Sequence, residues 1–299
     1  MTPPPYYTLL DPPLPPNLIL SNVRINKTVK IDHQEQLDKI KGFVEFFRNQ
    51  KTFWIEVAVL DRLYYKNLNQ QRPFHRFKRS MELRKLIKRL KSLAVDKELE
   101  RLYLSFWNVK TLDKCTGNWT FIPSKEAIEY SMHRIIGASL ILDKLKVVLV
   151  ETYRANSTLL KLEHFVSLAL VYMGLCSRLY SLCQVWLNEL EDCYYQLHQW
   201  SAAFPTGLKQ KHVESFMNSN NLACKEDTMK KARHTFAEQW MVSKSSIHHK
   251  VHLETYLANQ AIMDKVKDIQ LEVGIKAVDP IMGLNQDWDF EDLGEIIER

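Results

Sequence analysis

A chain of 299 residues is long enough to bury a sizeable core, and its eight glycines are too few for a protein built mainly from sheets and tight turns. The 41 basic and 35 acidic residues leave a net charge of +6. Five cysteines, an odd number without close pairs, exclude a disulfide framework and favour reduced thiols inside the cell. We expect no secretory leader, because no charged and then apolar stretch opens the chain.

Proline dominates the start of the chain. Residues 1–22 contain seven of the eleven prolines. Proline removes a backbone donor and cannot continue a helix, so we expect residues 1–30 to form an extended, mostly disordered arm.

Apolar residues then recur at helical spacing. The pattern predicts a first helix from the N-cap Asp32 to about Asn49 and a second from about Thr52 to Leu68, with Tyr64 on its inward face. A polar elbow from Asn67 to Pro73 ends the second helix, because Pro73 disfavours helix before it. One basic helix is expected from roughly Phe77 to Trp107.

The middle of the chain predicts the longest helices. Ser124 is placed to cap a helix that reaches Tyr153 or beyond. The block from Thr158 to Phe204 is apolar on more than one face, so we expect it to hold the central and most buried helix. A membrane span between Phe165 and Leu187 is the less favoured reading, since Arg178 interrupts that run.

The predicted fold is therefore all-α, an elongated antiparallel helical bundle around a long central apolar helix. The bundle takes residues 31–205 and follows the arm of residues 1–30. Residues 206–278 are expected to be a linker with accessory helices, at Lys225–Met241 and His249–Ile275. Residues 279–299 form an acidic tail, with seven acids and one base.

Positive charge is concentrated in one window, residues 62–91. It contains eleven lysines and arginines against the single acid Glu82, a net charge of +10, so the rest of the chain sums to −4. Aromatic side chains such as Tyr65 and Phe74 lie among these cations. Cations that neutralise phosphates, together with rings on which bases stack, are typical of proteins that bind RNA.

The second half of the window is amphipathic. Its leucines and Ile87 fall on one helical face and its cations on the other. An ordinary solvated charged face is the alternative, but it would mix signs, whereas like charges here repel one another. The candidate RNA-binding residues are Lys66, Asn67, Arg72, His75, Arg76, Lys78, Arg79, Arg84, Lys85, Lys88, Arg89 and Lys91.

Catalytic and metal-binding signals are weak. No glycine-rich phosphate loop or nucleophile elbow is present, so we expect a protein that is not an enzyme and has no cofactor. His248, His249 and His252 have the spacing of a metal pair but lack a third ligand at a suitable distance in the sequence, so no metal site is expected.

Two further places are candidates for contacts with partner proteins. Arg178 follows Ser177 inside the apolar block, where we expect its side chain to reach the surface, to form a structural ion pair or to contact RNA at the edge of the bundle. The acidic tail mixes carboxylates with apolar residues, which suits docking on a basic partner subunit or, less favoured, on the chain's own basic face. The candidate partner-binding residues are Ser177, Arg178, Trp288, Phe290, Leu293 and Ile296.

Three short motifs carry a resemblance to a known family. The polar elbow leads to a basic helix with Ile87-Lys88-Arg89-Leu90, and about 80 residues later the apolar block contains Gly174-Leu175-Cys176-Ser177-Arg178-Leu179. This order resembles the N-terminal domain of the nucleolus and neural progenitor protein family over roughly residues 35–205. That family is itself similar to a small protein subunit of fungal ribonuclease MRP, which the ending Asp292–Ile297 also resembles.

The resemblance implies a nuclear, nucleolar protein that scaffolds a ribonucleoprotein of the RNase MRP type in ribosomal RNA processing. Its expected partners are structured RNA and other protein subunits of the particle, with no membrane. The alternative function is a protein–protein adaptor in nuclear or developmental regulation, including neural differentiation. The chain departs from many family members in lacking a long lysine-rich C-terminal extension.

Overall fold

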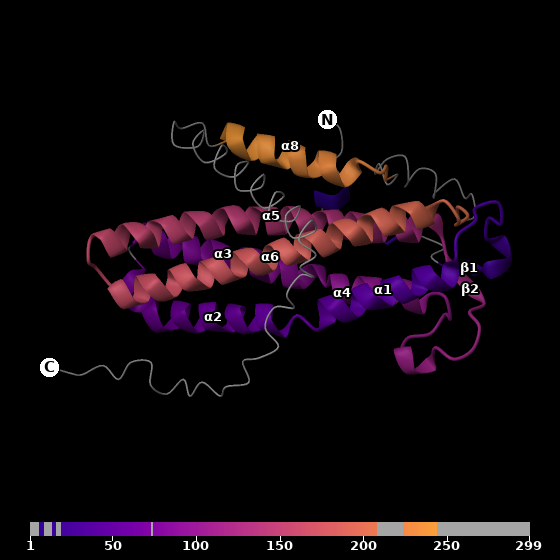
Figure 1. The fold of residues 1–299 in the computed structure, drawn as a ribbon, viewed down its shortest axis with the longest axis horizontal. Coiled ribbons are helices and arrows are strands. Elements are labelled where there is room, and N and C mark those ends of the chain that lie inside the picture. Colours follow the sequence, from indigo (N-terminus) through magenta and orange to yellow (C-terminus); the bar gives the residue numbers. More distant parts are fainter. Residues whose placement is uncertain (1–5, 9–13, 16–18, 73, 208–223, 244–299) are drawn as a thin grey trace, which may run out of the picture. The chain divides into compact units, whose positions relative to one another are not determined.

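The computed structural model describes residues 6–8, 14–15, 19–72, 74–207 and 224–243 (Figure 1). Residues Met1–Phe236 form one compact unit, to which the features below belong, and Ala237–Arg299 form a second. In the described parts, the strands are β1 (Ile19–Ser21) and β2 (Phe121–Pro123), and the long helices are α1 (His33–Arg48), α2 (Lys51–Gln71), α3 (His75–Leu93), α4 (Val95–Leu104), α5 (Lys125–Lys161), α6 (Val166–Ser201) and α8 (Thr228–Ser243).

The first six helices make a four-membered antiparallel bundle. Helices α1 and α2 together form the first member, and α3 and α4 return along them as the second; α5 and α6 are the third and fourth (Figure 1). Contacts close the ring, because α1 packs on α4, α2 on α3, both α3 and α4 on α5, α5 on α6, and α6 on α1 and α2. The predicted all-α antiparallel bundle is confirmed.

Two predicted helix starts are confirmed by their caps. The Asp32 carboxylate accepts hydrogen bonds from the backbone amides of Gln34, at 2.9 Å, and Glu35, at 3.3 Å. The Ser124 hydroxyl accepts one from the amide of Ala127 at 3.3 Å. Such caps satisfy amide donors that have no partner within the first turn of a helix.

The basic helix is shorter than predicted. The single helix expected from Phe77 to Trp107 is broken at Ala94, which has a φ of 45° and separates α3 from α4. The break frees the Leu93 carbonyl, which accepts a hydrogen bond from Arg134 of α5 at 2.9 Å. Beyond it, α4 buries Leu99 and Leu102. A tertiary contact that local periodicity does not report therefore accompanies the break.

The most buried helix is α5, not α6, which corrects the expectation for the Thr158–Phe204 block. Every residue from Glu126 to Asp143 except Arg134 is buried. Helix α6 begins only at Val166, after a turn, and leaves Leu170 51% exposed. Both helices pack against three others, but α5 also contacts the N-terminal segment, whereas α6 leaves Leu170, Val171 and Val185 exposed.

By length and apolar composition alone, α6 meets the requirements for a membrane span, with a mean hydropathy of 1.5 over its most apolar window. Leu179, Leu187 and Leu190 of this helix lie in the bundle core, which is sufficient reason for much of its apolar composition.

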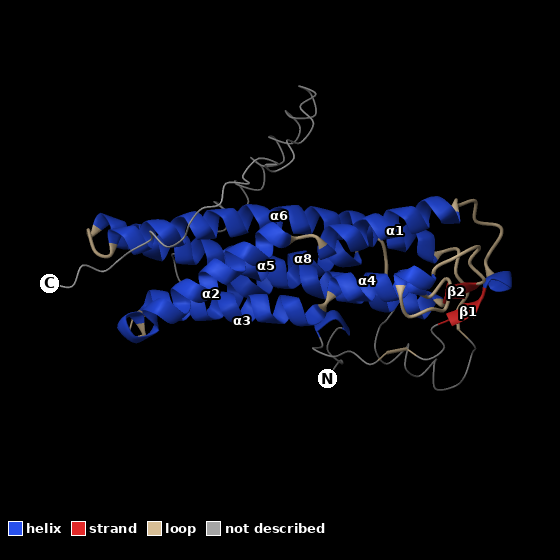
Figure 2. Cartoon of the chain, turned by 90° about the horizontal axis from the view of Figure 1, so that it is seen from below, coloured by secondary structure: helices blue, strands red, loops and turns tan. Residues whose placement is uncertain are grey.

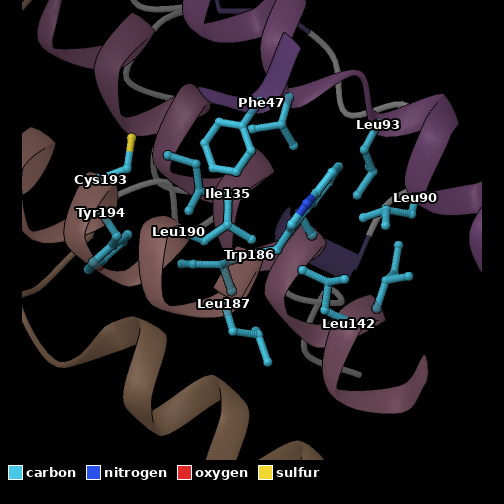
Figure 3. Close-up of a cluster of buried hydrophobic side chains, with 14 of the residues drawn as sticks. Phe47, Leu90, Leu93, Ile135, Leu142, Trp186, Leu187, Leu190, Cys193 and Tyr194 are labelled. Atoms are coloured by element: carbon cyan, nitrogen blue, oxygen red, sulfur yellow. The ribbon is translucent and has the colours of Figure 1, made fainter. Parts of the chain in front are cut away.

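The core contains residues from every member of the bundle (Figure 3). The Trp186 ring of α6 packs against Phe47 of α1 and Phe53 of α2, with ring centres 5.6 and 5.0 Å apart. Leu90 of α3 and Ile135 of α5 belong to the same cluster. All five cysteines are free, as expected.

The structure describes residues 6–8, 14–15 and 19–30 of the expected N-terminal arm, and parts of them pack on the bundle. The Tyr6 ring is only 1% exposed and lies against the His133 ring of α5, with centres 5.3 Å apart. A side chain at Gly137 would come within 3.0 Å of the Tyr7 carbonyl, so the glycine makes room for this segment. Strand β1 then pairs with β2, Leu20 opposite Ile122.

Candidate nucleic-acid interface

The predicted RNA-binding residues lie on the hairpin formed by α2, the elbow and α3 (Figure 2). His75 and Arg76 open α3, and their side chains lie outside the described structure. Asn67, Arg79 and Arg84 are half-buried. The remaining candidates are exposed: Lys66, Arg72, Lys78, Lys85, Lys88, Arg89 and Lys91.

Three of these cations form a row along the outer face of α3, which we name the outer ridge. Lys78, Lys85 and Arg89 are seven and four residues apart, a spacing that places them on one helical face over about 16 Å. None of the three pairs with a carboxylate in the part of the chain that the structure describes. The outer ridge thus presents uncompensated positive charge to solvent.

Arg79 faces α5 and is neutralised within the fold. Its guanidinium lies 3.0 Å from Glu82 one turn later and 3.1 Å from Glu151 of α5. Lys144 of α5 lies 3.9 Å from the same Glu82. Arg79 therefore belongs to a network that links α3 to α5.

Arg84 is also held by the fold. Its guanidinium pairs with Asp61 of α2, donates to the Tyr65 hydroxyl at 3.1 Å, and lies 4.0 Å from the centre of the Tyr64 ring. Burial disfavours the charged form, but the hydrogen bonds to Asp61 and Tyr65 outweigh it and raise the pKa of Arg84. Its role in the structure is to join α2 to α3.

Aromatic rings of two kinds occur in this hairpin. Tyr64 is 8% exposed and stacks on Phe77 at 4.7 Å, which confirms its predicted inward position. Tyr65, in contrast, is 64% exposed, and Phe74 at the elbow is 42% exposed. Arg84 orients Tyr65 through the hydroxyl contact. Exposed rings beside exposed cations provide stacking surfaces for unpaired bases.

The remaining polar candidate at the elbow side has a local partner. The Asn67 amide donates to the Leu63 carbonyl, one helical turn earlier, at 2.8 Å. Its amide oxygen is the group that would accept a hydrogen bond from a ligand.

A groove runs between α2 and α3, with a volume of about 560 Å³. Apolar side chains of both helices form its floor, and cations of α3 form one rim together with Arg84. Reading the sequence for basic residues alone missed the α2 side, although Trp54, Val57 and Asp61 recur at helical spacing. The lining residues are Trp54, Val57, Ala58, Leu60, Asp61, Tyr64, Met81, Arg84, Lys85, Ile87, Lys88 and Lys91.

The two predicted partner contacts on α6 are both exposed. Arg178 pairs with Glu56 of α2 at 2.9 Å, although 66% of the Arg178 side chain is exposed. Ser177 is exposed and donates to the Met173 carbonyl at 3.0 Å. Trp288, Phe290, Leu293 and Ile296 lie outside the described residues, as do the three histidines at 248, 249 and 252.

Within the described ranges, no group of three or more histidine, cysteine or acidic side chains is arranged to hold a metal ion. The main chemical feature of the α2–α3 hairpin is therefore the positive charge of its exposed lysines and arginines. Its exposed cations suit a polyanion, and its groove suits an apolar ligand with negative charge.

Comparisons with known proteins identify a family. A family model described as "Nucleolus and neural progenitor protein, N-terminal" matches residues 3–198, about two thirds of the chain. Neither the curated proteins nor the solved structures contain a match. The match includes the whole α2–α3 hairpin, and the family is nucleolar, as expected from the resemblance. The chain therefore belongs to the nucleolus and neural progenitor protein family, with the family's N-terminal domain at residues 3–198.

Proposed function

We propose that this protein is a non-catalytic RNA-binding scaffold subunit of a nucleolar ribonucleoprotein of the RNase MRP type, acting in ribosomal RNA processing. The observation that carries the proposal is the outer ridge. Lys78, Lys85 and Arg89 are exposed and have no counter-charge among the described residues.

Like charges along one helix face repel each other, so such a row is disfavoured unless a ligand supplies negative charge. An RNA backbone does so, and binding releases the counterions condensed on its phosphates. Tyr65 and Phe74 add exposed rings on which unpaired bases stack.

The architecture supports the choice of RNA over DNA in this proposal. Known DNA-binding motifs insert a helix or a two-stranded ribbon into the major groove and contact base edges from it. The outer ridge instead presents long, flexible cations, which suit the phosphates of a structured RNA. The proposal of an RNase MRP-type particle, and of a role in ribosomal RNA maturation, rests on the resemblance of the family to the fungal subunit.

The test is the salt dependence of RNA binding by the full-length chain. The probe is the RNA component of RNase MRP, titrated at several salt concentrations. Replacing Lys78, Lys85 and Arg89 together with Gln should reduce the log–log salt slope by about 2, at roughly 0.7 to 0.9 for each phosphate that the variant no longer neutralises.

A matched control removes the same number of charges elsewhere. Lys41, Lys97 and Lys110 are exposed lysines outside the hairpin. Their replacement with Gln should leave the slope close to that of the wild type. Equal slopes in the two triple variants would show that the ridge is not the RNA site.

A second experiment tests the particle. Immunoprecipitation of the protein followed by sequencing of the bound RNA should recover the RNase MRP RNA, and the ridge variant should recover less of it. A shallow salt slope together with no enriched RNA would support the adaptor function instead.

A further inference from the structure

We propose that the groove between α2 and α3 is a docking site for an acidic, amphipathic α-helix of a partner protein. This function goes beyond RNA binding and uses a different face of α3. Lys78 and Arg89 of the outer ridge lie outside the groove, and Lys85 borders both surfaces.

The groove exists because α2 and α3 are incompletely packed. The small, exposed Ala58 and the half-buried Val57 occupy the α2 side. Met81 on α3 is half-buried as well. In contrast, α1 buries Leu37 and Ile40 completely. The unfilled space between α2 and α3 leaves apolar surface accessible to a ligand.

The floor of the groove is mainly aliphatic. Leu60 and Ile87 form its base, with Val57 and Met81 partly exposed above them. Aliphatic side chains bind the apolar face of a peptide by removing both surfaces from water. These four side chains offer neither a stacking plane for a base nor a donor for a phosphate, so this part of the lining favours protein over RNA.

The rim selects negative charge. Lys85, Lys88 and Lys91 follow one another at intervals of three residues, about 4.5 Å of helix rise. Asp61, the one acid that lines the groove, is already paired with Arg84. At one end the Lys91 ammonium lies 5.5 Å from the centre of the Trp54 ring, so a cation and an aromatic surface are presented together.

The length of the groove indicates a short helical ligand. Its lining extends from Trp54 to Tyr64 on α2 and from Met81 to Lys91 on α3, ten residue steps on each helix. Ten steps correspond to about 15 Å, which three turns of a partner helix would cover. Apolar residues three and four apart would face the floor, and carboxylates beside them would meet the lysine rim.

The experiment measures fluorescence anisotropy of a labelled peptide with the full-length chain. The probe is a synthetic helical peptide of about 16 residues with leucines at helical spacing and flanking glutamates. A scrambled peptide of the same composition lacks the apolar stripe and should bind at least about tenfold more weakly. Equal binding of the two peptides would overturn the proposal, because attraction would then be electrostatic only.

The decisive variant changes the floor without changing charge. Replacing Val57 and Met81 with Asn should weaken peptide binding about tenfold and leave RNA affinity and its salt slope unchanged. Loss of RNA affinity to the same extent as peptide affinity would place RNA in the groove and overturn the proposal. Unchanged peptide affinity would also overturn it.

Two further variants complete the design. Lys78→Gln with Arg89→Gln should weaken RNA binding and keep peptide affinity within about twofold, since both residues lie outside the groove. Should the floor variant fail to fold by circular dichroism, Lys88→Gln with Lys91→Gln replaces it. This rim pair should weaken peptide binding by at least about threefold, and unchanged affinity would contradict the proposal.

The chain's own acidic tail is the competing occupant. Deleting residues 287–299 should leave peptide affinity unchanged if the groove serves a partner. A several-fold gain in peptide affinity on deletion would mean that the tail fills the groove, and the proposal of a partner helix would be wrong.

Discussion

Two groups of charged side chains in this protein differ in burial and in ion pairing. On α8, the Arg233 guanidinium is 16% exposed and binds Asp143 of α5 at 2.6 and 2.9 Å, and it also pairs with Glu191 of α6. On α3, Lys85 and Arg89 are exposed and lack a counter-charge among the described residues.

The difference separates charge that holds the fold from charge that is available for binding. A buried ion pair is costly to desolvate, so removing one partner leaves an unpaired buried charge and destabilises strongly. An exposed cation contributes little to stability whatever its neighbours. We therefore expect substitutions in the two groups to differ in both size and direction of effect.

The largest effect is expected at Arg233. Replacement with Leu leaves Asp143, whose side chain is 12% exposed, without its bidentate partner. The free energy of unfolding should fall by about 3 kcal/mol or more, measured by urea denaturation. Lys231 lies on the same helix but is 72% exposed, so it serves as the control. Lys231→Gln should change the free energy of unfolding by less than about 0.5 kcal/mol. Equal effects at both positions would remove the distinction between the two groups.

A buried carboxyl on α5, Glu129, forms no ion pair among the described residues and extends the comparison. Burial, mainly, raises the pKa of Glu129 from 4.5 to about 7; Lys125 opposes this and Glu126 adds to it. Because the folded protein holds this proton more tightly than the unfolded chain, the stability from the neutral carboxyl is complete below pH 4.5 and lost as the pH rises through about 7.

Glu129→Gln removes this ionisation while keeping the shape of the side chain. The variant should gain up to about 3 kcal/mol over the wild type at pH 8, and the gain should vanish near pH 4. Urea denaturation across this pH range measures it. A difference that does not change with pH would mean that Glu129 has an ordinary pKa in the folded protein.

Arg178 is intermediate, because it is exposed while its partner Glu56 is only 8% exposed. Replacement with Met should lower the free energy of unfolding by about 1 kcal/mol, less than at Arg233 because water still reaches the pair. The double variant with Glu56→Gln should recover part of the loss. A thermal melt of Arg178→Met that overlays the wild type would show that the pair contributes nothing.

The smallest effect is expected on the outer ridge. Replacing Lys85 and Arg89 with Gln should change the free energy of unfolding by less than about 0.5 kcal/mol, and any change should be stabilising because like charges are removed. Chemical denaturation at low salt is the sensitive measurement. A loss above about 1 kcal/mol would show that these cations hold the fold after all.

Local patterns in the sequence predicted much of the fold. The starts of α1 and α5 were correct because Asp32 and Ser124 cap through contacts within three residues. Tyr64 was correctly placed inward because helical periodicity alone separates the two faces of α2. The all-α antiparallel bundle was predicted from the same helical periodicity.

Features that depend on distant residues were not predicted. The break at Ala94 coincides with a hydrogen bond from Arg134, 41 residues away from Leu93. The burial of Tyr6 depends on α5, and the greater burial of α5 than of α6 depends on which elements surround each helix. None of these three features can be predicted from the residues within one or two helical turns of it.

The sequence by itself determined that positive charge is concentrated between residues 62 and 91, because composition requires no knowledge of the fold. Only the tertiary structure decided which of those cations are available. Arg79 and Arg84 are neutralised by Glu151 and Asp61, which come from other helices, while no carboxylate of the described residues pairs with the outer ridge. Charge is a property of each residue, but its compensation is a property of the distances that folding creates.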